Sequence, residues 1–143
     1  MSGKLYIVAT PIGNLGDITI RAVDILKSVD LVLAEDTRHS KKLFAHYEIG
    51  TSLRAFHEHN EKVKTEAIIN EINAGKSIAM ISDAGTPLIS DPGYHLVTKA
   101  KKANIEVIPI PGPSALITAL SSSGLASNSF TFFGFLPSKP VAR

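Results

Sequence analysis

The sequence predicts an α/β fold: an open, mostly parallel sheet with helices on both faces. Short apolar runs of strand length alternate with amphipathic stretches of helical length, which is the pattern of strands joined by helical crossovers. Glycine and proline gather directly after several apolar runs, where the chain must turn into the next helix. The 143 residues, 44% hydrophobic and 20% charged, have an ordinary globular composition. One self-sufficient domain is therefore expected.

Two strand–helix units are predicted in residues 4–47. Residues 4–10 carry the β-branched and aromatic residues of a strand, and a Pro- and Gly-rich turn separates them from a helix near 19–28. Residues 31–35 form the second strand, and Asp36 and Thr37 are suitable caps for a helix that continues to about Tyr47. The inward face of the first helix is expected to contain Ala22, Ile25, Leu26 and Val29.

Two further units are predicted in residues 53–103. A short strand at 53–56 precedes a helix at 60–74, with Asn60 as its cap and Gly75 as its left-handed stop. A strand at 77–82 is followed by a long turn, 83–93, which is too rich in Gly, Pro, Asp, Ser and Thr for either periodicity, and by a helix near 94–103. The inward face of the helix at 60–74 is expected to contain Val63, Ala67, Ile68 and Ile72.

The last predicted elements are a strand at 106–110, a helix capped by Ser114 that reaches about 123, and a strand at 129–134. Pro111-Gly112-Pro113 forces the turn between the first two. Residues 1–134 are interpreted as one α/β domain. Residues 135–143, which are rich in proline and basic residues, are interpreted as the start of an interdomain linker, with a second domain absent from this chain.

Composition excludes several classes of protein. The absence of cysteine excludes disulfide scaffolds, thiolate metal sites and cysteine nucleophiles, and it favours a cytoplasmic location. No apolar run approaches the roughly 18 residues of a membrane span, so no membrane partner is expected. Gly75-Lys76-Ser77 follows a helix and lacks the leading glycine of a phosphate-binding loop, which argues against a nucleoside-triphosphatase. A net charge of +2 neither supports nor excludes an RNA partner.

The loops that follow the strands form the candidate site, because ligands of open parallel sheets bind outside the carboxyl ends of the strands. Four such loops stand out, at 10–14, 35–38, 82–87 and 111–115. Gly13, Gly85 and Gly112 let the backbone approach a ligand, and N–H groups at helix starts suit a carboxylate. Alternatively, these glycines are only turn positions. A small anionic or zwitterionic ligand is expected.

Five segments, in this order, resemble the N-terminal half of the cytidine 2′-O-methyltransferases of ribosomal RNA, a family within the tetrapyrrole methylase superfamily. They are YIVATPIGNLGDITIRA, AEDTRHSKKLF, ISDAGTPLISDPG, PGPSA and FFGFLPSKP. The resemblance implies two α/β domains with S-adenosylmethionine between them, a homodimer, and small-subunit ribosomal RNA as the substrate. Because half a cleft leaves the cofactor hydrated, the chain alone is expected to be inactive.

The resemblance also assigns the cofactor contacts. The superfamily's first loop falls on Pro11, its Gly-Gly-Asp-Pro loop on 84–87, and the pair after the Pro-Gly turn on 114–115. Thr86 stands where the tetrapyrrole enzymes carry Asp, so a carboxylate contact is not implied there, and Asp83 is the candidate to replace it. Apolar walls suit the adenine ring. The complete predicted set is Pro11, Ile12, Gly13, Asp83, Ala84, Gly85, Thr86, Ile89, Ser114 and Ala115.

Methyl transfer to a ribose hydroxyl needs a group that polarises or deprotonates it, and Asp36, at the end of a strand, is the predicted catalytic residue. Its alternative role is a helix cap. Arg38, Lys41 and Lys42 share one helix face and are the predicted RNA-phosphate contacts, with a solvated basic face as the alternative.

The histidines are not expected to be functional. His57 and His59 are too sparse for a metal site, and no metal is expected. The remaining histidines, His39, His46 and His95, are interpreted as surface or packing residues. Two rival functions stay open: a tetrapyrrole or corrin methylase, and a non-catalytic ligand-binding or dimerisation module.

Overall fold

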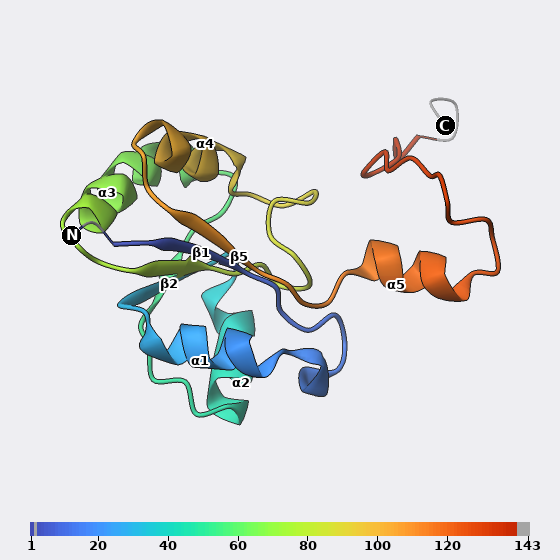
Figure 1. Cartoon of the computed structure of the whole chain (residues 1–143), viewed down its shortest axis with the longest axis horizontal. Helices are drawn as coiled ribbons and strands as arrows, with labels where there is room; N and C mark the ends of the chain where they lie inside the picture. Colours follow the sequence, from blue (N-terminus) through green and yellow to red (C-terminus); the bar gives the residue numbers. More distant parts are fainter. Residues whose placement is uncertain (2, 140–143) are drawn as a thin grey trace.

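The computed structural model describes residue 1 and residues 3–139. Strands alternate with helices along this range, which confirms the predicted α/β class. The elements labelled in Figure 1 or described below are β1 (Leu5–Val8), η1 (Leu15–Asp17), α1 (Ile20–Ser28), β2 (Leu31–Ala34), α2 (Thr37–His46), β3 (Leu53–Ala55), α3 (Glu61–Asn73), β4 (Ile78–Met80), α4 (Tyr94–Lys102), β5 (Val107–Ile110) and α5 (Ala115–Ser122).

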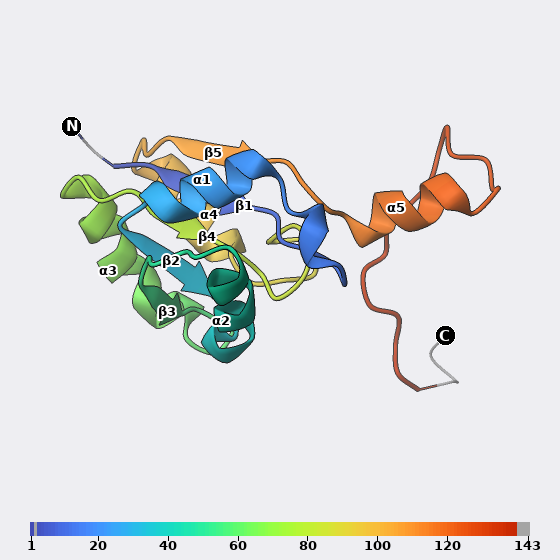
Figure 2. The same ribbon diagram turned by 90° about the horizontal axis from the view of Figure 1, so that it is seen from below.

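The sheet is parallel throughout, with the strand order β3-β2-β4-β1-β5. Ile78 of β4 lies opposite both Leu5 of β1 and Leu31 of β2, so β4 separates the first two strands. The chain first crosses toward β3 and later returns toward β5, and this reversal places α1 and α2 on one face and α3 and α4 on the other, as Figures 1 and 2 show. β1 and β4 are neighbours, but the chain leaves the carboxyl end of β1 toward β2 and the carboxyl end of β4 toward β5. The two connections therefore run in opposite directions.

Each face of the sheet has its own apolar core. On one face, strand residues such as Val8, Val32 and Ala79 pack against Leu26 of α1 and Phe44 of α2. The other face carries a second cluster under α3 and α4, whose members include Leu5, Leu33, Phe56, Ile68, Ile72, Met80 and Leu96. All three residues of β4 are buried, as expected for a central parallel strand that is covered on both sides.

The helix starts agree with the sequence only in part. Thr19 Oγ1 accepts a hydrogen bond from the Ala22 N–H (3.0 Å), which caps α1. Asn60 precedes α3, but its side chain accepts from the His57 N–H (2.9 Å) and does not cap the helix. Ser114 likewise makes no side-chain cap at α5. Gly75, with φ +104°, adopts the expected positive-φ conformation after α3.

The inward face of α3 differs from the prediction at two positions. Val63 is 84% exposed and Ala67 is exposed, whereas Thr65 and Ile69 are buried together with the correctly predicted Ile68 and Ile72. The buried stripe thus follows 65, 68, 69 and 72, with the helix rotated away from 63 and 67. Thr65 can be buried because its hydroxyl donates to the Glu61 carbonyl (2.7 Å), which leaves no unpaired polar atom.

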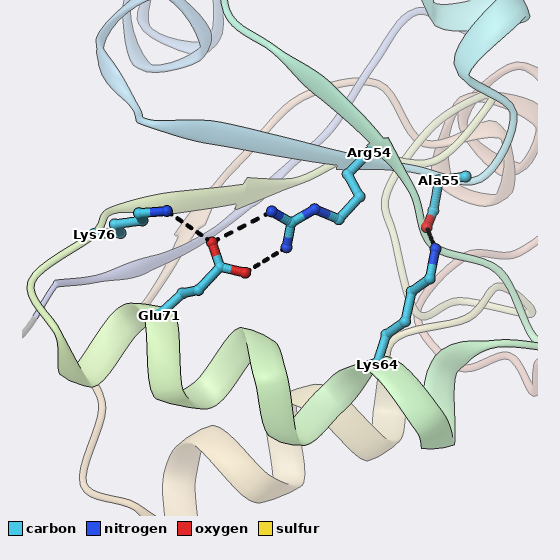
Figure 3. A network of polar contacts seen from close by, with 5 residues as sticks. All are labelled: Arg54, Ala55, Lys64, Glu71 and Lys76. Atoms are coloured by element: carbon cyan, nitrogen blue, oxygen red, sulfur yellow. Dashed lines mark hydrogen bonds and ion pairs between the residues drawn. The ribbon is translucent and has the colours of Figure 1, made fainter.

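Polar contacts attach α3 to the edge strand β3 (Figure 3). The Arg54 guanidinium donates two hydrogen bonds to the Glu71 carboxylate, and Lys76 Nζ lies 3.0 Å from the same carboxylate. Nearer the start of the helix, Lys64 Nζ donates to the Ala55 carbonyl (2.8 Å). These bonds fix the helix along the length of β3, which has no neighbouring strand on its outer side.

Glu61 connects α3 to the start of α4. Its Oε1 atom accepts hydrogen bonds from the backbone N–H groups of Gly93 (3.2 Å), His95 (2.9 Å) and Leu96 (3.3 Å). Gly93 is the residue before α4 and has no side chain that could cap the helix. The carboxylate of a different helix therefore supplies both the acceptor and the negative charge that a helix N-terminus favours.

The predicted strand at 129–134 is wrong. Residues 129–134 form no strand, and Phe130, Phe132 and Phe133 are 49%, 49% and 80% exposed. The edge strand nearest in sequence is β5, where Pro109 has no N–H to donate to a further strand. Figures 1 and 2 show α5 and the segment after it extending away from the sheet, and α5 buries no residue. Of the expected linker 135–143, residues 140–143 lie outside the described residues.

Candidate functional site

Loops that follow β1 and β4 are hydrogen-bonded to each other at the carboxyl edge of the sheet. Thr10 and Gly85 exchange two backbone hydrogen bonds, both of 3.0 Å, and form an isolated antiparallel bridge. The Thr10 hydroxyl donates to the Ser82 carbonyl (3.1 Å), and the Ser82 hydroxyl donates back to the Gly85 carbonyl (3.1 Å). The two loops therefore form one rigid unit at the point where their connections diverge.

The loop after β5 joins the same unit. Thr86 Oγ1 donates to the Pro113 carbonyl (3.3 Å), so the hydroxyl at the position where the superfamily carries Asp has a backbone partner. Gly85 has φ +80°, and a Cβ there would lie 3.4 Å from Ile12 Cγ2 and 3.6 Å from the Pro113 carbonyl oxygen. Gly85 thus stands where all three loops meet, in a conformation that glycine adopts without strain.

The other two candidate glycines have different surroundings. A Cβ on Gly13, whose φ is +146°, would meet no atom within 4 Å, so its backbone is open to a ligand. A Cβ on Gly112 would lie 2.9 Å from the Ala9 Cβ atom. The lack of a side chain at Gly112 therefore serves contact between the loop and β1, in agreement with the turn-position alternative.

A pocket of about 410 Å³ opens on the α2 side of this edge. It is lined by residues 10–15, by residues 81–84 and by His39, Ser40, Lys42 and Leu43 of α2. Ile12, Leu43 and Ile81 give it apolar walls, while His39, Lys42 and Asp83 contribute polar groups. Apolar walls with a few polar groups are typical of a pocket for a small organic ligand.

The predicted cofactor residues divide between this pocket and its surroundings. Pro11, Ile12, Gly13, Asp83 and Ala84 line the pocket. Gly85 and Thr86 hold the loops together behind it. The remaining members lie outside the pocket: Ile89, which is 53% exposed, Ser114, which is half-buried, and Ala115, which is exposed.

Asp36 caps α2. Its Oδ1 accepts from the Arg38 N–H (2.9 Å), and Arg38 Nε lies 3.5 Å from the same oxygen. These contacts, together with the His39 N–H, hold the pKa of the Asp36 carboxyl below its usual value. The Asp36 N–H in turn donates to Asp83 Oδ1 (3.2 Å), so the loop after β2 is connected to the loop after β4.

Two carboxylates near the site were not singled out from the sequence. Burial is the main cause that raises the pKa of Glu35 and of Asp91, and the nearby charge of Asp83 raises both further. Glu35 directly follows β2, so its position at a strand end was a usable signal. Asp91 lies far along the 83–93 turn, and nothing local in the sequence places it beside Asp83.

The basic residues of α2 do not act as one group. Arg38 and Lys42, both exposed, lie together with Asp36 and His39 around a smaller hollow beside the pocket. Lys41 is exposed and lines neither cavity. The structure thus brings Arg38 and Lys42 to the mouth of the site and leaves Lys41 apart from it.

His39 has a contact that sequence reasoning missed. Its Nε2 atom lies 3.0 Å from the backbone carbonyl oxygen of Asp83, and its side chain lines the pocket. The usable signal was its place three residues after Asp36, in the first turn of a helix that begins at the ligand edge. Of the other histidines, the His57 and His59 rings face each other edge-on at 5.9 Å, and His46 similarly contacts Tyr47.

The described part of the chain contains neither a cluster of metal-binding side chains nor a helix suited to spanning a membrane. Across residue 1 and residues 3–139, no three or more His, Cys, Asp or Glu side chains gather closely enough to hold a metal ion. None of the helices in that range combines the length and the apolar character that crossing a bilayer requires.

A parallel sheet with reversed crossovers, whose joined loops border a pocket at the carboxyl edge, defines a doubly wound α/β protein with a candidate ligand site at that edge. The match is more specific than this class: residues 4–136 fit the model of the Tetrapyrrole (Corrin/Porphyrin) Methylases, and the chain belongs to that family. Among solved structures, uroporphyrin-III-C-methyltransferase from Thermus thermophilus is similar in fold, with a TM-score of 0.67 and 23% identity over 88% of this chain and 55% of that one.

Curated relatives carry a more specific name. A Vibrio cholerae protein named ribosomal RNA small subunit methyltransferase I is 61% identical over 139 residues, which is 97% of this chain and 48% of that protein. Proteins of the same name from Xylella fastidiosa and Escherichia coli O157:H7 are 60% and 55% identical, over 99% of this chain and 52% and 49% of their own length. The chain therefore spans about half the length of these relatives.

Proposed function

We propose that this chain is the cofactor-binding part of an S-adenosylmethionine-dependent methyltransferase that modifies a cytidine 2′-hydroxyl of small-subunit ribosomal RNA. The observation that carries the proposal is the joining of the β1, β4 and β5 loops at Thr10, Gly85 and Pro113 beside a pocket. The names of the curated relatives support the RNA substrate.

The residues present fit this methyl donor. The open backbone at Gly13 leaves room for close approach, and the apolar walls Ile12 and Ile81 suit an adenine ring. Asp83, at the border of the pocket, offers oxygen atoms to an ammonium group or to ribose hydroxyls. We assign to cofactor binding Pro11, Ile12, Gly13, Asp83, Ala84, Gly85, Thr86, Ile89, Ser114 and Ala115.

When bound, S-adenosylmethionine supplies an electrophilic sulfonium methyl group. The loops then have to hold that methyl in line with the ribose oxygen and to exclude water. We further propose that Arg38, Lys41 and Lys42 bind phosphates of an RNA whose nucleoside enters the pocket. Arg38 and Lys42 border the smaller hollow, and Lys41 lines neither cavity. Asp36, the catalytic residue that the sequence predicts, lies at the rim, where its Oδ1 atom caps α2.

Other parts of the proposal rest on the family resemblance. A homodimer, a cytoplasmic location and the division into residues 1–134 and a linker from 135 stay predictions. The chain by itself is expected to bind the donor weakly, because the part of the relatives beyond this chain would cover the other side of the ligand.

The decisive experiment uses a fusion in which this chain replaces the matched half of the Vibrio cholerae relative. Radiolabelled S-adenosylmethionine is offered with small ribosomal subunits or with a porphyrinoid precursor, and modified cytidines are mapped by mass spectrometry. We expect cytidine 2′-O-methylation and no labelled porphyrinoid. Label in the porphyrinoid alone would favour the tetrapyrrole methylase. A fusion that does not bind the donor in calorimetry, while the intact relative does, would contradict the proposal.

A further inference from the structure

The hydrogen bond to the Asp83 carbonyl determines the tautomer of His39. A backbone carbonyl has no proton to donate, so the 3.0 Å contact between His39 Nε2 and the Asp83 oxygen requires the proton to reside on Nε2. In the neutral imidazole the other ring nitrogen, Nδ1, then carries a lone pair. Within the described residues, Nδ1 of His39 has no hydrogen-bond donor of its own.

The His39 side chain borders both of the cavities that the proposed function uses. His39 borders both the 410 Å³ pocket and the smaller hollow in which Arg38 and Lys42 lie. Of the two residues of α2's first turn that line the pocket, His39 and Ser40, only His39 carries an imidazole. Its backbone is held by the Asp36 cap and its ring by Asp83, so it is fixed from two sides.

Two carboxylates beside it, Asp36 and Asp83, are already engaged. Asp36 accepts from the first turn of its own helix and from the Arg38 side chain, and an anion stabilised in this way is a weak proton acceptor. Asp83 Oδ1 accepts the Asp36 N–H. The nearby cations, Arg38 and Lys42, have no lone pair to offer while they are charged.

We propose that His39 Nδ1 is the general base of the methyl transfer that the proposed function assigns to this site. The 2′-oxygen of the nucleoside forms a bond to the methyl carbon, and the carbon–sulfur bond of the sulfonium donor breaks with its electron pair going to sulfur. The hydroxyl proton goes to Nδ1 and is later released to water. The Asp83 carbonyl orients the ring and stabilises the imidazolium that results.

The test compares His39→Gln, Asp36→Asn and His46→Gln in the fusion described above. Glutamine places an N–H near the position of Nε2 and so keeps the contact with Asp83, but it has no equivalent of Nδ1. Asparagine keeps the oxygen that caps α2. His46 is exposed in the last turn of the same helix and serves as the matched control. The readouts are the single-turnover rate with small subunits and the donor affinity by calorimetry.

We expect His39→Gln to lower the transfer rate by about 10²-fold or more, with donor affinity changed by less than about twofold, because general-base catalysis typically contributes at least that factor. His46→Gln is expected to match the parent. A transfer rate for His39→Gln within threefold of the parent rate overturns the inference. So does a loss of about 10²-fold in Asp36→Asn while His39→Gln keeps the parent rate. An unmodified fusion that transfers no methyl group overturns the proposed function itself.

A second readout needs no catalysis. Long-range ¹⁵N–¹H spectra of the chain report which ring nitrogen of each neutral histidine is protonated, and the His39 signals are assigned by their loss in His39→Gln. We expect the Nε2–H tautomer, with Nδ1 unprotonated. The Nδ1–H tautomer would remove the lone pair that the inference requires and would overturn it independently of the rate measurements.

Discussion

Glu61 offers the sharpest test of how this fold is held together. Its Oε1 atom is the shared acceptor for the N–H groups of Gly93, His95 and Leu96, and Gly93 and Leu96 are buried. In Glu61→Ala these groups lose a cap worth about 0.5–2 kcal/mol and a charge–dipole attraction of about 0.3–1 kcal/mol. We therefore expect the free energy of unfolding to fall by roughly 2–3 kcal/mol, since burial hinders replacement by water.

The measurement is urea unfolding followed by circular dichroism, with hydrogen exchange of the Gly93, His95 and Leu96 amides as a local readout. Glu61→Gln keeps an oxygen acceptor and should lose only the charge–dipole part, about 0.3–1 kcal/mol. Glu66→Ala is the matched control, because Glu66 also joins α3 to α4, through Lys99 at 2.8 Å, but in an exposed ion pair that solvent screens. Equal losses in Glu61→Ala and Glu66→Ala, or a Glu61→Ala loss below about 0.5 kcal/mol, would refute the reasoning.

Two further changes test the packing and the charge network. Gly112→Ala would place a Cβ 2.9 Å from the Ala9 Cβ atom, and we expect the overpacking to cost about 1–3 kcal/mol in urea unfolding. Gly50→Ala, where a Cβ meets nothing within 4 Å, should be close to neutral, and an equal cost at both sites would contradict this. Arg54, and to a lesser extent Lys76, holds the pKa of Glu71 below its usual 4.5. The ionised carboxylate therefore stabilises the fold above pH 4.5, and this contribution is lost as the pH falls through the lowered pKa. Glu71→Gln should therefore lower the melting temperature at pH 7, with the difference from the parent narrowing in acid; a difference independent of pH would argue against the network.

Local sequence patterns were sufficient for the order of the elements and for the edge of the sheet that carries the site. The strands at 4–10, 31–35, 77–82 and 106–110 were found because each apolar run ended at a Pro or Asp signal, whereas the short strand at 53–56 has no such signal after it. The meeting of the loops at Thr10, Gly85 and Pro113 follows from parallel strands, whose carboxyl ends share one edge.

The errors arose where the outcome depends on neighbours far away in the sequence. Residues 129–134 have the composition of a strand, but a strand also needs an edge to pair with, and β5 offers one interrupted by Pro109. In α3 the apolar residue Val63 is exposed and the polar residue Thr65 is buried. Thr65 can be buried because its hydroxyl donates a hydrogen bond to the Glu61 carbonyl within the same helix. His39 was undervalued for the same reason, since its partner lies 44 positions along the chain.

The strand order also constrains how the protein emerges from a ribosome. β1 and β2 are made first, yet neither touches the other in the finished sheet, because β4 must insert between them. Until residue 80 has left the exit tunnel, β1 has no strand to pair with in the sheet. Synthesis beyond residue 80 is thus a precondition for the central sheet to form, and a nascent chain stopped earlier exposes unpaired strand edges that favour aggregation.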